Sequence, residues 1–119
     1  MRKTIFAKEA PEPVGPYSQA VLANGTLYCS GQIAVDRLDR DVAVQTEAAC
    51  RNLAAVLAAA GGSLADVVKT TCFLADMDDF ARFNPVYETH FPHKPARSCV
   101  AAKQLPKGAL VEIDAIAVL

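Results

Sequence analysis

Two charged side chains in the last quarter of the chain lie inside apolar, strand-like runs. Arg97 stands among small and apolar residues in the segment 95–100, and Glu112 lies between Val111 and Ile113. Removing a charge from water costs free energy unless the charge gains a partner or a ligand. A guanidinium can hold a carboxylate through two parallel hydrogen bonds, and a carboxylate can orient a water or accept its proton. The pair therefore suggests a site that binds an anionic substrate with Arg97 and handles a water with Glu112.

Each of these residues also has a purely structural alternative. Arg97 could serve in an internal ion pair, and an isolated glutamate on a strand is more often a solvated side chain than a catalytic one. The planar fork of an arginine nevertheless suits a carboxylate better than a lysine does, and the small neighbours of Arg97 leave room for a ligand. Both residues are therefore retained as candidates.

The N-terminal part of the chain is typical of strands joined by tight turns. Three strands are predicted, at residues 3–6, 17–23 and 26–35. The segment 10–16 contains three prolines and a glycine, so it is expected to be a rigid loop. Asn24 and Gly25 predict a two-residue hairpin turn, because both positions of a type I′ turn need positive φ.

The central part of the chain predicts the longest helix, at residues 42–60, ended by Gly61 and Gly62. A β-branched run at 66–74 predicts a central strand. Strands at 97–102 and 110–119 are expected to complete the chain.

A second helical region is predicted between residues 77 and 91. Aromatic residues recur there at helical spacing, from Phe80 to Phe91. Pro85 is expected to break the helix into a short turn at 77–83 and a second helix, with Asn84 as the cap and Pro85 in the first position.

The order β-β-β-α-β-α-β-β predicts an α+β fold of two layers, with a mixed sheet of about six strands and two helices on one face. Strand residues such as Cys72, Ile113 and Ile116 place apolar side chains on both faces of the sheet. Two helices can cover only one face, so a homo-oligomer that packs sheet against sheet is expected to cover the other.

Composition bounds the class of protein. The 119 residues predict a single domain, residues 1–119, and the 52% hydrophobic content is enough for a core. The net charge is −1 and there is no long basic run, so nucleic-acid binding is not expected. The N-terminus has no apolar signal-peptide region, and no run is long enough to span a membrane. A cytoplasmic protein with four reduced cysteines is therefore expected.

Two other chemistries are weighed and disfavoured. Cys99 is a possible nucleophile, but no histidine neighbours it in the sequence and no helix start is placed to lower its pKa. His90 and His93 are spaced like metal ligands, but the intervening Pro92 argues for a surface loop.

Six stretches, taken together, resemble one known family. They are residues 15–20 (GPYSQA), 30–32 (SGQ), 66–73 (DVVKTTCF), 79–84 (DFARFN) followed by Tyr87, 95–98 (PARS) and 111–117 (VEIDAIA). The combination resembles the Rid family of reactive-intermediate enamine/imine deaminases, also known as the YjgF family, and most of all its RidA branch.

This resemblance implies a chorismate-mutase-like fold and a homotrimer with its sites at the clefts between subunits. It implies hydrolysis of 2-iminobutanoate and 2-iminopropanoate to 2-oxo acids and ammonia, with no cofactor and no metal. The expected partners are thus a small imino or 2-oxo acid and two further copies of the chain, and neither nucleic acid nor membrane.

The resemblance also implies roles for individual residues. Arg97 matches the arginine that binds the substrate carboxylate, and Glu112 matches the acidic residue that holds the hydrolytic water. The remaining matches line or approach the site: Tyr17, which is also a candidate catalytic residue, Ser30, Gly31, Asn84 and the backbone of Cys99.

Three alternatives stay open. The substrate could be another small imine or enamine such as 2-aminomuconate. The chain could act on RNA, as a ribonuclease or translation inhibitor, although it lacks a basic patch. It could also bind a ligand, or act as a holdase, without turnover.

Overall fold

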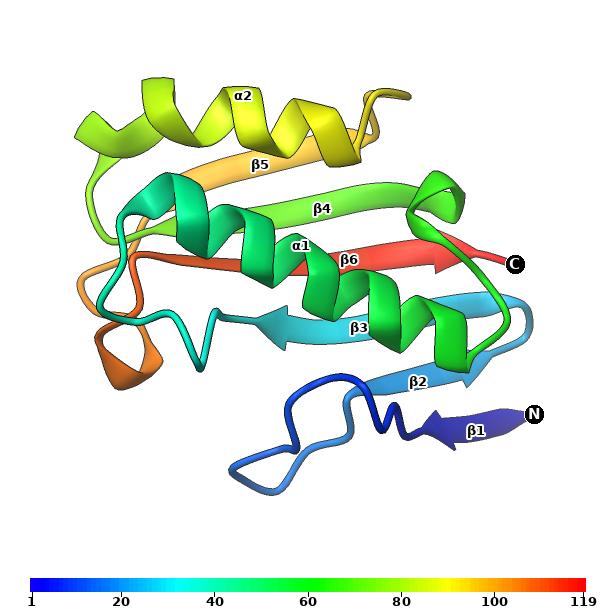
Figure 1. Cartoon of the computed structure of the whole chain (residues 1–119). Coiled ribbons are helices and arrows are strands. Elements are labelled where there is room, and N and C mark those ends of the chain that lie inside the picture. Colours follow the sequence, from blue (N-terminus) through cyan, green and yellow to red (C-terminus); the bar gives the residue numbers. More distant parts are fainter.

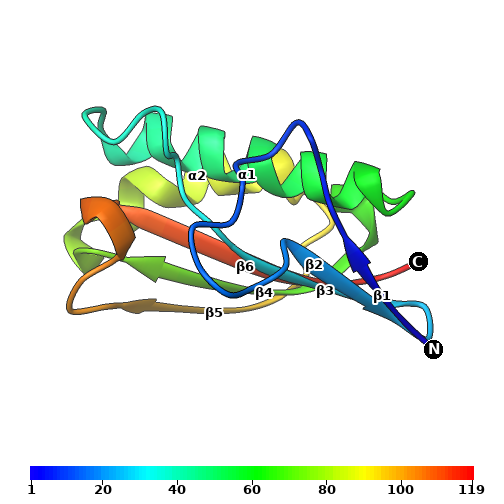
Figure 2. The ribbon, with the colours of Figure 1, turned by 90° about the horizontal axis from the view of Figure 1, so that it is seen from below.

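The computed structural model describes all residues, 1–119, as a six-stranded sheet with two α-helices on one face (Figures 1 and 2). The strands are β1 (Arg2–Ile5), β2 (Ala20–Ala23), β3 (Thr26–Gln32), β4 (Val67–Leu74), β5 (Ala96–Ala101) and β6 (Val111–Val118). The helices are α1 (Val42–Ala59) and α2 (Phe80–His90), and single 3₁₀ turns occur at Leu64–Asp66, Met77–Asp79 and Pro106–Gly108. The predicted α+β fold and element order are confirmed.

The sheet is mixed, with the strand order β1-β2-β3-β6-β4-β5. Only β4 and β5 run parallel, and every other neighbouring pair is antiparallel. The predicted hairpin turn is present, because Asn24 and Gly25 have φ values of 54° and 83°. The sequence left open whether a hairpin or a crossover joins the last two strands; β4 lies between them, so the connection is a crossover.

Helix α1 buries a mainly apolar face on the sheet, in which valines and leucines outnumber the one alanine. Its N-terminus is capped by Asp41, whose Oδ1 accepts a hydrogen bond from the Val44 amide at 3.0 Å. Ala49, Cys50 and Leu53 are fully buried. Ala49 and Cys50 are small, so the helix can lie close to the strands at that turn, while Leu53 fills the space beside them.

Helix α2 is continuous through Pro85, so the predicted break and the capping role of Asn84 were wrong. A proline inside a helix removes one backbone hydrogen bond and costs about 3 kcal/mol or more. The helix continues directly from the preceding 3₁₀ turn and buries Phe83, Tyr87 and Phe91, whose successive ring centroids lie 5.5 and 4.6 Å apart. Burial of this aromatic face outweighs the interruption.

The face of the sheet opposite the helices is not covered by the chain itself (Figure 2). Exposed apolar side chains lie along it from β3 to β5: Tyr28, Val100 and Val118 are 51%, 48% and 54% exposed. The same face also carries Lys69, Thr71 and Asp114, so it is a mixed surface. Exposed apolar side chains on an uncovered sheet face are typical of an interface. Neither helix combines the length and the hydropathy that a membrane span requires.

A buried hydrogen bond ties α2 to the sheet. The hydroxyls of Tyr87 and Thr70 lie 2.7 Å apart, and Thr70 is fully buried. We expect Tyr87→Phe to lower the free energy of unfolding by about 1–2 kcal/mol, because the Thr70 hydroxyl then loses its strong partner away from water. Chemical unfolding measures this, with Tyr28→Phe as the control, since Tyr28 is half exposed. Equal stability of the two variants would contradict the prediction.

Candidate active site

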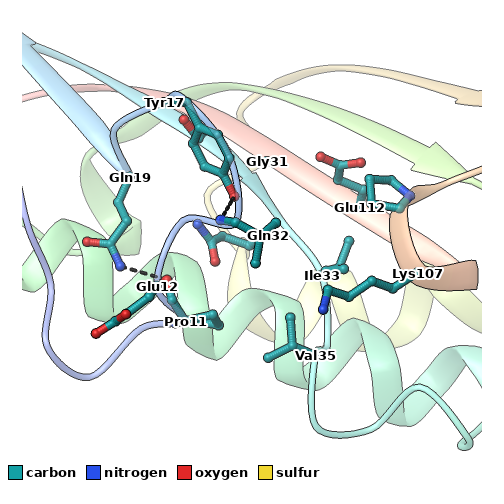
Figure 3. Close-up of a pocket in the computed structure, with 13 residues that line it drawn as sticks. Pro11, Glu12, Tyr17, Gln19, Gly31, Gln32, Ile33, Val35, Lys107 and Glu112 are labelled. Atoms are coloured by element: carbon teal, nitrogen blue, oxygen red, sulfur yellow. Dashed lines mark hydrogen bonds between the residues drawn. The ribbon is translucent and has the colours of Figure 1, made fainter.

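A cavity of about 340 Å³ lies between the proline-rich loop, the end of β3 and the start of β6 (Figure 3). Four predicted site residues line it: Tyr17, Ser30, Gly31 and Glu112. They come from three separate parts of the chain, so the fold brings them together. Its size is at the small end of the range for ligand pockets in proteins.

The loop that forms one wall is held by Gln19, which the sequence analysis did not single out. Gln19 is 1% exposed; its amide nitrogen donates to the carbonyls of Ala7 and Pro11, and its oxygen accepts from the Ala7 amide. In the sequence, the only indication of this role was the position of Gln19 between two small residues, Ser18 and Ala20, at the start of an apolar strand. Because this side chain replaces backbone pairing for the loop, it fixes the cavity wall.

The hydroxyl groups of the site are held by the same loop. Ser30 Oγ donates to the Ser18 carbonyl at 2.6 Å. The Tyr17 hydroxyl accepts a hydrogen bond from the Val14 amide at 3.4 Å, and the ring is 47% exposed. The phenol proton of Tyr17 therefore remains available to a ligand in the cavity.

Glu112 lies directly against the backbone of Gly31. An ideal Cβ built on Gly31 would overlap with the Glu112 carboxylate and lie 2.9 Å from its Cγ. The ladder between β3 and β6 shifts register between Cys29 and Gln32, and this irregularity brings Gly31 next to the carboxylate. Only a glycine leaves room for Glu112 in this position.

The pKa of Glu112 is raised above its ordinary value, mainly because the carboxyl group is half-buried and also because Asp114 lies near it. Both residues are on β6, two positions apart, so their side chains share one face of the sheet. A carboxylate with a raised pKa is a stronger base and still ionises at neutral pH if the shift is moderate. Glu112 is therefore suited to orienting a water and accepting its proton.

Arg97 lines a second cavity, of about 300 Å³, between α2 and the start of β5. Its Nη1 donates to Asn84 Oδ1 at 2.9 Å, and its guanidinium carbon lies 4.9 Å from the centroid of the Tyr87 ring. No carboxylate in the chain pairs with Arg97. The purely structural role as an internal ion pair is therefore absent, and several of the guanidinium donors are free for an anion.

Arg97 and Glu112 lie on opposite faces of the sheet. Arg97 is paired with the buried Thr70 of β4 on the helix side, whereas Glu112 is paired with Phe73 on the uncovered side. Side chains of directly paired residues share a face, and those of successive residues alternate. A single chain therefore does not bring the two charges together, contrary to the simplest expectation from the sequence.

The remaining candidates fall on the Arg97 side or outside both cavities. Cys99 lies on the same face as Arg97, and burial raises the pKa of its thiol although Arg97 acts in the opposite direction. A thiol of this kind is a poor nucleophile. His90 ends α2 and lies 2.7 Å from Glu47, while His93 bonds the Val67 carbonyl, so the two imidazoles serve separate structural contacts.

Comparison with known proteins places the chain in a family. Residues 7–119 match the family model described as endoribonuclease L-PSP. A RutC family protein of Pyrococcus horikoshii is 46% identical over 123 residues, covering 98% of both chains. The 2-iminobutanoate/2-iminopropanoate deaminase of Rattus norvegicus is 44% identical over 124 residues, covering 99% of this chain and 90% of the relative.

Solved structures agree with this placement. The crystal structure of Escherichia coli TdcF with bound serine has a TM-score of 0.93 and 39% sequence identity, covering 98% of both chains. Its sheet and helices therefore superimpose on those of this chain over almost their whole length. By both sequence and structure, the chain belongs to the Rid family, also known as the YjgF or RutC family.

Proposed function

We propose that this protein hydrolyses small 2-imino acids, such as 2-iminobutanoate and 2-iminopropanoate, to the 2-oxo acids and ammonia. The observation that carries the proposal is the pair of complementary half-sites: a guanidinium with no carboxylate partner and a partly desolvated carboxylate on a cavity wall. The relatives that are named as deaminases of these imines support the same chemistry.

The proposed site is completed by a second copy of the chain. Since Arg97 and Glu112 face opposite sides of one sheet, Arg97 of one subunit would have to meet Glu112 of another. The uncovered sheet face, with its exposed apolar side chains, supports such an assembly. A homotrimer, which the family resemblance implies, provides three equivalent clefts of this kind.

The proposed mechanism is a hydrolysis in which the protein mainly positions groups. Arg97 holds the substrate carboxylate, and Glu112 directs a water at C2 and accepts its proton. The C–O bond forms as the C=N π electrons move to nitrogen, and Glu112 returns the proton of the water to that nitrogen. The hydroxyl proton of this adduct then moves to the amino group, the C–N bond breaks as the C=O bond forms, and ammonia and the 2-oxo acid are released. Tyr17 and Ser30 would orient the substrate from the cavity wall.

A coupled assay tests the proposal. A threonine dehydratase generates the imine in the presence of a compound that traps it, and the rate of 2-oxobutanoate formation is measured with and without the protein. Faster formation of the oxo acid, proportional to protein concentration, is expected. Binding of 2-oxobutanoate without any acceleration would reject the enzyme and favour a ligand-binding protein.

The raised pKa of Glu112 predicts how the rate of this reaction depends on pH. Water activation needs the ionised carboxylate, so kcat/KM, after subtraction of the uncatalysed rate, should fall as the pH drops through a value above that of an ordinary glutamate. Asp114→Asn should shift this acidic limb to lower pH, because it removes a neighbouring charge that raises the pKa of Glu112. Asp36→Asn, at an exposed position outside both cavities, is the control. An unchanged limb in Asp114→Asn would show that another group controls the profile.

A further inference from the structure

The first cavity contains one positively charged side chain, that of Lys107, which the proposed mechanism does not use. Lys107 lies in the 3₁₀ turn Pro106–Gly108, just before β6, and reaches across the cavity toward Ile33 and Val35 (Figure 3). It takes part in none of the ion pairs of the chain. The cavity wall thus holds an ammonium group that has no acidic partner.

The backbone at Lys107 is unusual for a lysine. Its φ and ψ are 58° and 21°, in the left-handed region, and the following Gly108 also has positive φ, at 71°. Glycine and asparagine are the residues that commonly adopt this conformation, whereas a lysine there is disfavoured. Such an outlier on a cavity wall is a reason to ask what the side chain does there.

The charges of the cavity are separated. The Glu112 carboxylate points toward Gly31, whereas the Lys107 side chain runs to the other end, where apolar residues lie (Figure 3). Glu12 also lines the cavity, but its carboxylate points away from Lys107 (Figure 3). Both residues are exposed at the rim of the cavity, so solvent reaches the ammonium group until a ligand binds. A ligand with its C2 carbon beside Glu112 and its side chain along the cavity would meet an apolar stretch that ends in a cation.

We propose that Lys107 forms a second anion subsite, which binds an acidic group at the far end of the substrate, so that 2-imino dicarboxylates are substrates as well. This inference rests on the proposed imine hydrolysis, in which Arg97 binds the carboxylate next to C2. The reaction is unchanged: water adds to C2, ammonia leaves, and the product is a 2-oxo dicarboxylate. Lys107 takes no part in the bond changes and acts as a specificity-determining residue.

Binding of stable 2-oxo acids tests the subsite. The dissociation constants of 2-oxobutanoate and 2-oxoglutarate are measured by calorimetry for the intact protein and for Lys107→Asn, in which asparagine tolerates the left-handed backbone. Loss of a charge-assisted hydrogen bond should weaken 2-oxoglutarate about ten-fold more than 2-oxobutanoate. Lys107→Arg should keep the preference. Lys103→Asn, at an exposed position in the same connection and outside the cavity, should change neither ligand.

Two results would overturn the subsite. Equal weakening of both ligands would mean that Lys107 binds the carboxylate that they share, and no weakening would mean that Lys107 binds neither. Measuring the hydrolysis of 2-iminobutanoate distinguishes a failure of the subsite from a failure of the proposed deaminase function. If 2-iminobutanoate is hydrolysed but Lys107→Asn does not discriminate, the subsite alone is wrong. If no imine is hydrolysed but Lys107 still determines 2-oxoglutarate binding, the deaminase and the dicarboxylate substrates are wrong, and Lys107 is an anion subsite for bound 2-oxo acids only.

Discussion

Replacing Arg97 with alanine is expected to lower kcat/KM for 2-iminobutanoate by at least about a hundred-fold while the chain stays folded. Truncating one partner of a desolvated charge pair commonly costs about 2–5 kcal/mol of binding free energy, and the Arg97 guanidinium has no carboxylate of its own to satisfy. Within the chain, Arg97 donates one hydrogen bond, to Asn84, and its guanidinium carbon lies 4.9 Å from the centroid of the Tyr87 ring. The loss should therefore be much larger in turnover than in stability, where only the contacts with Asn84 and the Tyr87 ring are removed. Steady-state kinetics and thermal unfolding of the same preparation measure both quantities.

Two further variants make this result specific. Arg97→Lys keeps the charge but not the planar fork, so it should recover little activity if the carboxylate is bound through two hydrogen bonds. Arg82→Ala is the matched control. Arg82 is an arginine of α2 that also bonds a side chain, that of Asp41, but it is exposed and lines neither cavity. A folded Arg97→Ala protein with normal activity would remove Arg97 from the site.

The opposite faces of Arg97 and Glu112 allow a second test with the same variant. If each site combines Arg97 of one subunit with Glu112 of another, Arg97→Ala and Glu112→Gln are each inactive, but mixed oligomers contain some clefts with both native residues. Unfolding the two variants together and refolding them should restore part of the activity. If mixed oligomers form and stay inactive, the two residues do not act in one site across a subunit boundary.

Much of the fold could be predicted from local patterns. Asn24 and Gly25 defined the hairpin, the alanine-rich periodic run defined α1, and the β-branched run from Val67 defined β4. These signals are strong because local geometry and burial favour the same structure. The error at Pro85 has the opposite origin, since a local preference for a helix break was overridden by burial of the aromatic face of α2.

The site was harder to predict than the fold. The residue types of Arg97 and Glu112 identified two charges that needed partners, but the face on which a side chain lies depends on the strand order. With β4 between β5 and β6, the register places the two charges on opposite faces. Gln19 and Lys107 were missed because their importance comes from a buried loop contact and a cavity wall, which are visible only in three dimensions.

The second large effect is expected at Gly31, where alanine should lower kcat/KM for the imine by about a hundred-fold or more. The added methyl group would overlap with the Glu112 carboxylate, and its carbon would lie 2.8 Å from Glu112 Cδ, so the glutamate has to move. Misplacing a catalytic group by about 1 Å can cost about a hundred-fold in rate. Because the displaced carboxylate can move into the neighbouring cavity, unfolding should change less than activity does.

Gly15→Ala is the matched control for Gly31→Ala. Gly15 is on the loop that forms the opposite wall, and a Cβ there would meet only the Tyr17 ring, at an ordinary contact distance of 3.7 Å. Kinetics and unfolding of the two variants should therefore separate displacement of Glu112 from general disturbance of the cavity. If Gly31→Ala keeps full activity, the position of the Glu112 carboxylate does not determine the rate, and another group must direct the water. If instead Gly31→Ala retains substrate binding but loses turnover, the observed contact between Glu112 and the Gly31 backbone is what aims the carboxylate at the reacting carbon.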